Sequence, residues 1–107
     1  MPQVVELSVS EYAALRARGD AHVLVDVRTP REVELARIDG GRLLDDPTFE
    51  ELRAAPRDTV LVFQCHHGIR SHAAARHFAS LGFERTFNLT GGIDRWSLEI
   101  DPAVPRY

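Results

Sequence analysis

Hydrophobic residues along the chain fall into short continuous runs and longer stretches with helical spacing. The clearest continuous runs are residues 23–27 (Val-Leu-Val-Asp-Val) and 60–63 (Val-Leu-Val-Phe). Strands that are apolar at consecutive positions are buried on both faces, as in a parallel sheet covered by helices. Weaker strand candidates of the same type occupy residues 4–7, 42–44 and 86–89. The pattern therefore predicts a central parallel sheet of about five strands.

Helix-start signals stand between these strands. Ser8 with Glu11, and Thr29 with Glu32, have the spacing of a capping box, in which each side chain bonds the other residue's backbone amide. Pro30 suits a first helical position because it lacks the N–H that would go unpaired there. Further helices are predicted at three places, opening at Asp46-Pro47, ending at Gly82, and following Gly92. Alternating strands and helices predict an α/β fold, a three-layer sandwich with helices on both faces of the sheet.

Length and composition narrow the class of protein. A chain of 107 residues is expected to form a single domain over residues 1–107. The first residues contain no long apolar stretch, so neither a secretory signal nor a membrane span is predicted. We therefore expect a cytoplasmic protein with no membrane partner. All 13 basic residues are arginines, scattered singly in a chain of net charge −3. Nucleic-acid binding needs clustered positive charge, so no nucleic-acid partner is expected.

Cys65 is the only cysteine, and it stands between the strand at residues 60–64 and a predicted helix. Ligands in α/β folds bind at the carboxyl ends of the strands. Backbone amides of the loop and of the helix start are expected to point at the sulfur and to lower the thiol pKa below about 8.5. Gly68 permits the turn, and Arg70 suits an anionic substrate. The arrangement favours a cysteine nucleophile over the alternative of a buried structural cysteine.

Three segments of the sequence resemble the single-domain rhodaneses, the thiosulfate sulfurtransferase family. Residues 65–71 (Cys-His-His-Gly-Ile-Arg-Ser) resemble the active-site loop. Residues 26–32 resemble the Asp-x-Arg-x-x-x-Glu segment, and residues 90–96 resemble the Gly-Gly-x-x-x-Trp signature. The three occur in the expected order and together span most of the chain. Residues 36–40, Ala-Arg-Ile-Asp-Gly, depart from the family's Gly-His-Ile-Pro-Gly, which leaves the shape of the site's edge open.

The resemblance implies a rhodanese-like fold and a function. Cys65 would carry a persulfide without any cofactor, taking sulfur from thiosulfate or a protein persulfide and passing it to cyanide or another thiol. The substrate-binding residues would be the loop residues that follow the cysteine, namely His66, His67, Gly68, Ile69, Arg70 and Ser71. Their amides would hold the outer sulfur, and Arg70 would bind an anionic donor. Residues 100–107 also resemble the tails of rhodanese domains fused to activating enzymes, which implies a ubiquitin-like sulfur carrier system as a partner.

Two other functions remain as alternatives. Phosphatases and arsenate reductases also use a cysteine in an anion-binding loop, but their loop resembles Cys followed by five residues and Arg. Here four residues separate Cys65 from Arg70, a smaller ring suited to one sulfur atom. A non-catalytic rhodanese-like interaction module is the second alternative. Such modules usually lose the cysteine, which this chain keeps.

The remaining polar candidates receive structural interpretations. His66 and His67 are not expected to bind zinc, because adjacent side chains diverge and no second pair of ligands follows. Arg28 is expected to pair with Glu32 and to hold down the loop between them, rather than to act in catalysis with Asp26. Trp96 is expected to anchor the last helix in the core.

Overall fold

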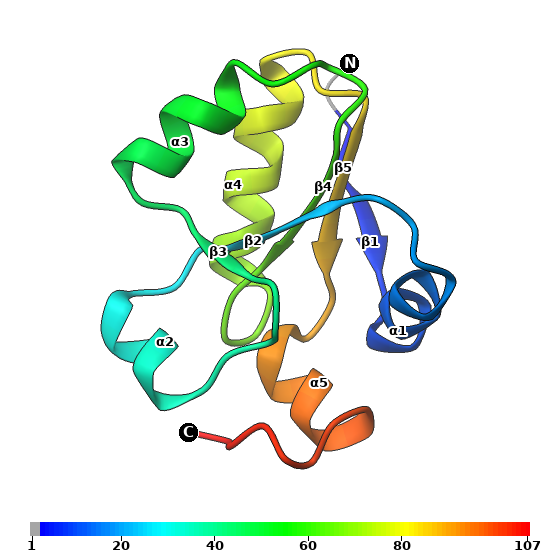
Figure 1. Ribbon diagram of the computed structural model, residues 1–107, viewed down its shortest axis with the longest axis vertical. Helices are drawn as coiled ribbons and strands as arrows, with labels where there is room; N and C mark the ends of the chain where they lie inside the picture. The colour runs from blue at the N-terminus through cyan, green and yellow to red at the C-terminus, as the bar shows by residue number, and fades with distance from the viewer. Residues whose placement is uncertain (1–2) are drawn as a thin grey trace.

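The computed structural model describes residues 3–107, which contain a sheet of five strands (Figure 1). Every pairing is parallel, in the order β1-β5-β4-β2-β3. The strands are β1 (Val5–Leu7), β2 (Val23–Asp26), β3 (Arg42–Leu43), β4 (Val60–Gln64) and β5 (Arg85–Leu89). The predicted parallel sheet is confirmed, and each strand lies within a residue or two of the expected position.

Helices cover both faces of the sheet, as expected (Figure 1). They are α1 (Val9–Arg18), α2 (Pro30–Leu35), α3 (Asp46–Arg53), α4 (Ile69–Ser80) and α5 (Gly92–Glu99). Helices α1 and α5 lie on one face, and α3 and α4 lie on the other. Helix α2 follows the carboxyl end of β2 and contacts the start of α4. None of the helices in residues 3–107 is long and apolar enough to cross a membrane.

Two hydrophobic cores lie against the two faces of the sheet. Consecutive residues of β4 alternate between them, with Leu61 and Phe63 in the core under α3 and α4 and Val62 in the core under α1 and α5. Burying each such side chain contributes roughly 1.5–3 kcal/mol. Trp96 belongs to the second of these cores and is 6% exposed, which confirms its prediction as an anchor of α5.

Both predicted capping boxes form. The Ser8 hydroxyl accepts from the Glu11 amide at 3.0 Å, and the Thr29 hydroxyl accepts from the Glu32 amide at 3.2 Å. Helix α3 begins with Asp46 but is capped by the residue before it, because the Asp45 carboxylate accepts from the Thr48 amide. The box at Thr29 fixes the start of α2 three residues after β2 ends. It thereby places the Glu32 side chain at the carboxyl edge of the sheet.

Candidate active site

Cys65 lies at the carboxyl end of β4, the middle strand of the sheet, and the helix after it begins at Ile69. The thiol is almost completely covered, with Cys65 1% exposed. Strands β2 and β5 flank β4, so the segments that leave all three strands meet around the sulfur. This is the position that the sequence predicts for the cysteine.

Cys65 Sγ is surrounded by hydrogen-bond donors from the loop that follows it. The Gly68 amide lies 3.2 Å away, and the Ser71 amide and hydroxyl lie at 3.4 and 3.3 Å. Burial raises the pKa of the Cys65 thiol, but these hydrogen bonds and one from the His67 amide outweigh it, so the pKa lies below its ordinary value. We call Cys65 Sγ and these donors the sulfur cradle. Its amides confirm the expected loop geometry, and the Ser71 hydroxyl adds a donor that the sequence analysis did not anticipate.

Two glycines allow neighbouring segments to approach this loop. Gly68 has φ of +97°, a backbone angle that other residues rarely adopt. A Cβ on Gly92 would collide with the Cys65 carbonyl and would lie 2.6 Å from the His66 carbonyl oxygen. Those same two carbonyls accept hydrogen bonds from Ile93 and Asp94 at the start of α5, at 2.9 and 3.1 Å. Gly92, the second glycine of the Gly-Gly signature, therefore allows α5 to pack directly against the cysteine loop.

Asn88, near the end of β5, fixes the cysteine loop through side-chain hydrogen bonds. The sequence did not single it out as a site residue. Its Oδ1 accepts from the Ser71 hydroxyl at 2.6 Å, and its Nδ2 donates to the Gly68 carbonyl at 3.0 Å. Nδ2 also donates to the Glu6 carboxylate from β1. Asn88 is 2% exposed. An asparagine between Phe87 and Leu89 in a predicted strand was the available signal, because a buried amide needs such partners.

Arg28 pairs with Asp26, not with the Glu32 carboxylate as the sequence analysis predicts. Its Nε and Nη2 donate to the two Asp26 oxygens at 2.9 and 2.6 Å, and both side chains are buried. Burial opposes the charge of Arg28, but hydrogen bonds to Asp26 and Tyr107 outweigh it and raise the pKa of the guanidinium. Toward Glu32, Arg28 reaches only the backbone carbonyl, at 3.2 Å. The prediction is wrong because Asp26 is the buried carboxylate and Glu32 has another cationic partner.

That partner is Arg70. Its Nη1 and Nη2 donate to the two Glu32 carboxylate oxygens at 2.7 and 2.9 Å, a forked ion pair across 38 positions of sequence. The Tyr107 hydroxyl donates to Glu32 Oε2 at 2.7 Å. Arg70 holds the pKa of Glu32 well below its usual range, and Glu32 in turn raises the pKa of Arg70. The arginine expected to bind an anionic donor is thus already paired.

The two histidines after the cysteine lie face to face. Their ring centroids are 3.9 Å apart, and the His66 ring also stacks on Tyr107 at 4.0 Å. The expectation that these side chains diverge is therefore wrong. Ligand atoms of His66, His67 and Asp94 lie within 4.8 Å of one another. Arg106 already holds the Asp94 carboxylate at 2.9 Å. The absence of a metal centre stays a prediction.

Comparison with known proteins places this site in a family. The family model described as "Rhodanese-like domain" matches residues 8–99. The chain belongs to the rhodanese-like family. It is 35% identical over 97 residues to a thiosulfate sulfurtransferase GlpE from Pseudomonas fluorescens, a match that covers 90% of this chain and 87% of that protein. It is 27% identical over its whole length to an "Adenylyltransferase and sulfurtransferase MOCS3-2" from Zea mays, of which it spans 24%.

Solved structures agree with this assignment. A rhodanese-like domain protein from Staphylococcus aureus superimposes with a TM-score of 0.77 at 20% identity, over 96% of this chain and 98% of that one. The human single-domain sulfurtransferase TSTD1 superimposes with a TM-score of 0.72 at 26% identity, over 92% of this chain and 97% of that one. The predicted rhodanese-like α/β fold is confirmed.

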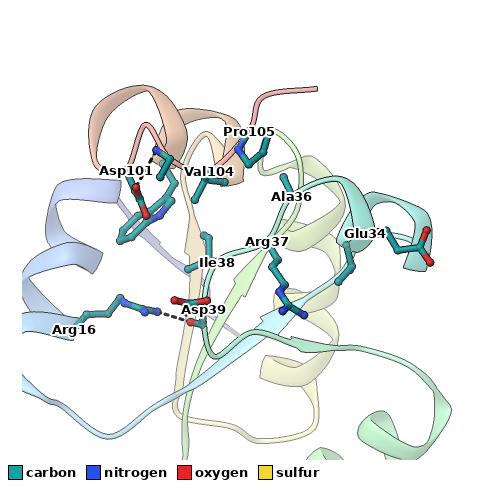
Figure 2. Close-up of a pocket in the computed structure, with 12 residues that line it drawn as sticks. Arg16, Glu34, Ala36, Arg37, Ile38, Asp39, Asp101, Val104 and Pro105 are labelled. Atoms are coloured by element: carbon teal, nitrogen blue, oxygen red, sulfur yellow. Dashed lines mark hydrogen bonds between the residues drawn. The ribbon is translucent and has the colours of Figure 1, made fainter.

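The segment that departs from the rhodanese pattern lines a separate pocket of about 610 Å³ (Figure 2). Arg37 and Asp39 lie at this pocket, whereas Ala36 and Ile38 also belong to the core. Its other walls come from α2, from residues 101–105, and from Arg16 of α1 and Trp96 of α5. None of its lining residues belongs to the 65–71 loop. The departure therefore changes this neighbouring pocket and leaves the contacts of the sulfur cradle intact.

Proposed function

We propose that this rhodanese-like chain is a sulfurtransferase that carries a sulfane sulfur on Cys65. The donor is thiosulfate or a protein persulfide, and the acceptor is cyanide or another thiol. The observation that carries this proposal is the sulfur cradle, in which three hydrogen-bond donors from Gly68 and Ser71 converge on one buried sulfur. The 35% identity to a thiosulfate sulfurtransferase supports the same assignment.

The first half of the reaction loads the cysteine. The Cys65 thiolate, favoured by its lowered pKa, attacks the sulfane sulfur of the donor. A new S–S bond forms to Cys65 as the S–S bond within the donor breaks, and sulfite leaves thiosulfate with the electron pair. The charge then rests on the outer sulfur of a Cys65 persulfide. Amides of the loop are the groups positioned to stabilise that charge, since they are fixed before the reaction begins.

The second half of the reaction transfers the outer sulfur from Cys65 to the acceptor. Cyanide or an acceptor thiolate attacks the outer sulfur, and the electron pair of the S–S bond returns to Cys65 as thiolate. No oxidant, reductant or cofactor is needed, because the sulfur moves with balanced electrons. The maize relative joins adenylyltransferase and sulfurtransferase in its name. That likeness supports a ubiquitin-like sulfur carrier system as the partner of this chain.

The test combines mass spectrometry with turnover. Protein purified without reductant and treated with thiosulfate should gain the mass of one sulfur atom on Cys65, and it should release thiocyanate when cyanide is added. Hydrolysis of a chromogenic aryl phosphate should be negligible, because a loop with four residues between Cys65 and Arg70 encloses one atom rather than a tetrahedral group. Robust phosphatase turnover without sulfur transfer would overturn the proposal.

A further inference from the structure

Three arginines lie on the segments packed around the cysteine loop, and each is paired with a carboxylate. The pairs are Arg28 with Asp26, Arg70 with Glu32, and Arg106 with Asp94. We call these six side chains the arginine rim. Its three positive and three negative charges cancel. These three arginines therefore add no net positive charge around a site expected to bind an anion.

The pair between Arg70 and Glu32 is the one that affects an incoming donor most directly. Arg70 lies at the start of the helix that follows Cys65, five positions after the cysteine, and its side chain is 45% exposed. Two of its five N–H donors go to Glu32. Glu32 is only 16% exposed in its side chain and also accepts from Tyr107 and from the Thr29 amide. A carboxylate bonded on several sides is held in one place and remains ionised.

This arrangement makes the charge of the donor decisive. An anion that approaches Arg70 meets the Glu32 carboxylate at the same time. Electrostatic energy is proportional to the charge of the approaching group, so a dianion experiences twice the repulsion from Glu32, and twice the attraction to Arg70, that a monoanion experiences. Solvent and salt weaken the effect at a partly exposed site, but they do not change that proportion at short range.

We propose that Glu32 is a specificity-determining residue, which reduces the advantage that Arg70 alone would give to dianions such as thiosulfate over sulfur donors with at most one negative charge. Organic persulfides and thiosulfonates are donors of this less charged class. This inference rests on the sulfur transfer proposed above and narrows its donor. With a thiosulfonate, the Cys65 thiolate attacks the sulfane sulfur, the S–S bond breaks, and a sulfinate leaves with the electron pair.

Two donors that differ mainly in charge allow a direct test. Methanethiosulfonate has a methyl group where thiosulfate has a charged oxygen, and both release sulfur by the same bond cleavage. The variant is Glu32→Gln, since glutamine still completes the capping box with Thr29 and still accepts from Tyr107. Glu34→Gln is the matched control. It removes the same charge from the same helix, at an exposed residue that lines the separate pocket of Figure 2.

Glu32→Gln should raise kcat/KM about tenfold for thiosulfate and about threefold for methanethiosulfonate, and the change should lie in KM. The logarithm of the gain should be twice as large for the dianion as for the monoanion, because the electrostatic energy is proportional to the charge of the donor. Both gains should shrink at high salt, and Glu34→Gln should change neither.

Equal changes for both donors, or no gain with thiosulfate, would overturn the role of Glu32 and leave sulfur transfer standing. Failure of wild-type Cys65 to take sulfur from either donor would overturn the proposed function, and the inference with it.

Discussion

The sulfur cradle and the arginine rim meet at the same loop, but they are assembled over very different distances along the chain. The cradle joins Cys65 to donors three and six residues further on. The central pair of the rim joins Glu32 to Arg70 across 38 positions, and Tyr107, which lies outside the rim, donates to Glu32 across 75. A loop between a strand and a helix is enough to build the cradle, whereas the Arg70–Glu32 pair needs α2 and α4 to pack together. We therefore expect the cradle to control reactivity and the rim to control which donor reacts.

Removing the nucleophile should have the largest effect. Cys65→Ser should lose all but a few per cent of thiocyanate formation, because no other thiol can hold the sulfur. The fold should persist, since a serine hydroxyl can accept from the same amides. Circular dichroism provides the control for folding. Turnover that survives in a folded Cys65→Ser protein would mean that sulfur transfer does not pass through the cradle.

Removing Arg70 from the rim should have the next largest effect on turnover, and the size of the loss should depend on the sulfur donor. Arg70→Ala leaves the Glu32 carboxylate without its main partner, so kcat/KM for thiosulfate should fall about 10- to 100-fold, the range expected for a lost charge-assisted hydrogen bond. The loss with methanethiosulfonate should be smaller. Combining Arg70→Ala with Glu32→Gln should recover much of the thiosulfate activity. Equal losses with both donors would instead assign Arg70 to positioning of the loop.

Asn88→Ala tests whether the cradle depends on support from β5. The Ser71 hydroxyl and the Gly68 carbonyl each lose a buried partner, and each such loss costs about 1–3 kcal/mol. Turnover should fall about tenfold with either donor. The pKa of Cys65 should rise toward its ordinary value, read as the midpoint of alkylation rate against pH. An unchanged midpoint would show that the cradle keeps its shape without Asn88.

The pH dependence should separate the two regions in the wild type. Because the pKa of the Cys65 thiol is lowered, the thiolate persists to lower pH than in the unfolded chain, and the alkylation midpoint should lie below about 8.5. The pKa of Glu32 is also lowered, so its charge is lost only in strong acid, well below pH 5. Turnover should therefore change with pH while the ratio of the two donors stays flat between pH 6 and 9. A ratio that follows the thiol titration would contradict this division.

The smallest effect is expected at Tyr107. Tyr107→Phe removes one hydrogen bond to Glu32 and one from Arg28 but keeps the ring on His66. Loss of an uncharged hydrogen-bond donor at a half-exposed site should hold Glu32 less firmly. It should therefore raise kcat/KM for thiosulfate only about threefold or less. Methanethiosulfonate should respond even less. A loss of activity with both donors would indicate that Tyr107 positions His66 instead.

The cradle could be predicted from the sequence because its interactions are local. A continuous apolar run followed by a cysteine, a glycine and a helix start defines a strand, a loop and amides that point at the sulfur. The capping boxes and the parallel sheet follow from local patterns in the same way. Each of these features depends on residues within one helical turn or one strand, so the identity of nearby residues suffices.

The partner of each arginine in the rim was decided only by the tertiary structure. Asp26 and Glu32 are both carboxylates within reach of Arg28 in sequence, and composition alone does not say which is buried beside it. Arg70 takes Glu32 because α2 and the start of α4 lie together at the carboxyl edge of the sheet. The last stretch of chain then brings Tyr107 to the same carboxylate. Ion pairs between distant segments depend on which side chains packing brings within hydrogen-bond distance, and spacing along the sequence does not contain that information.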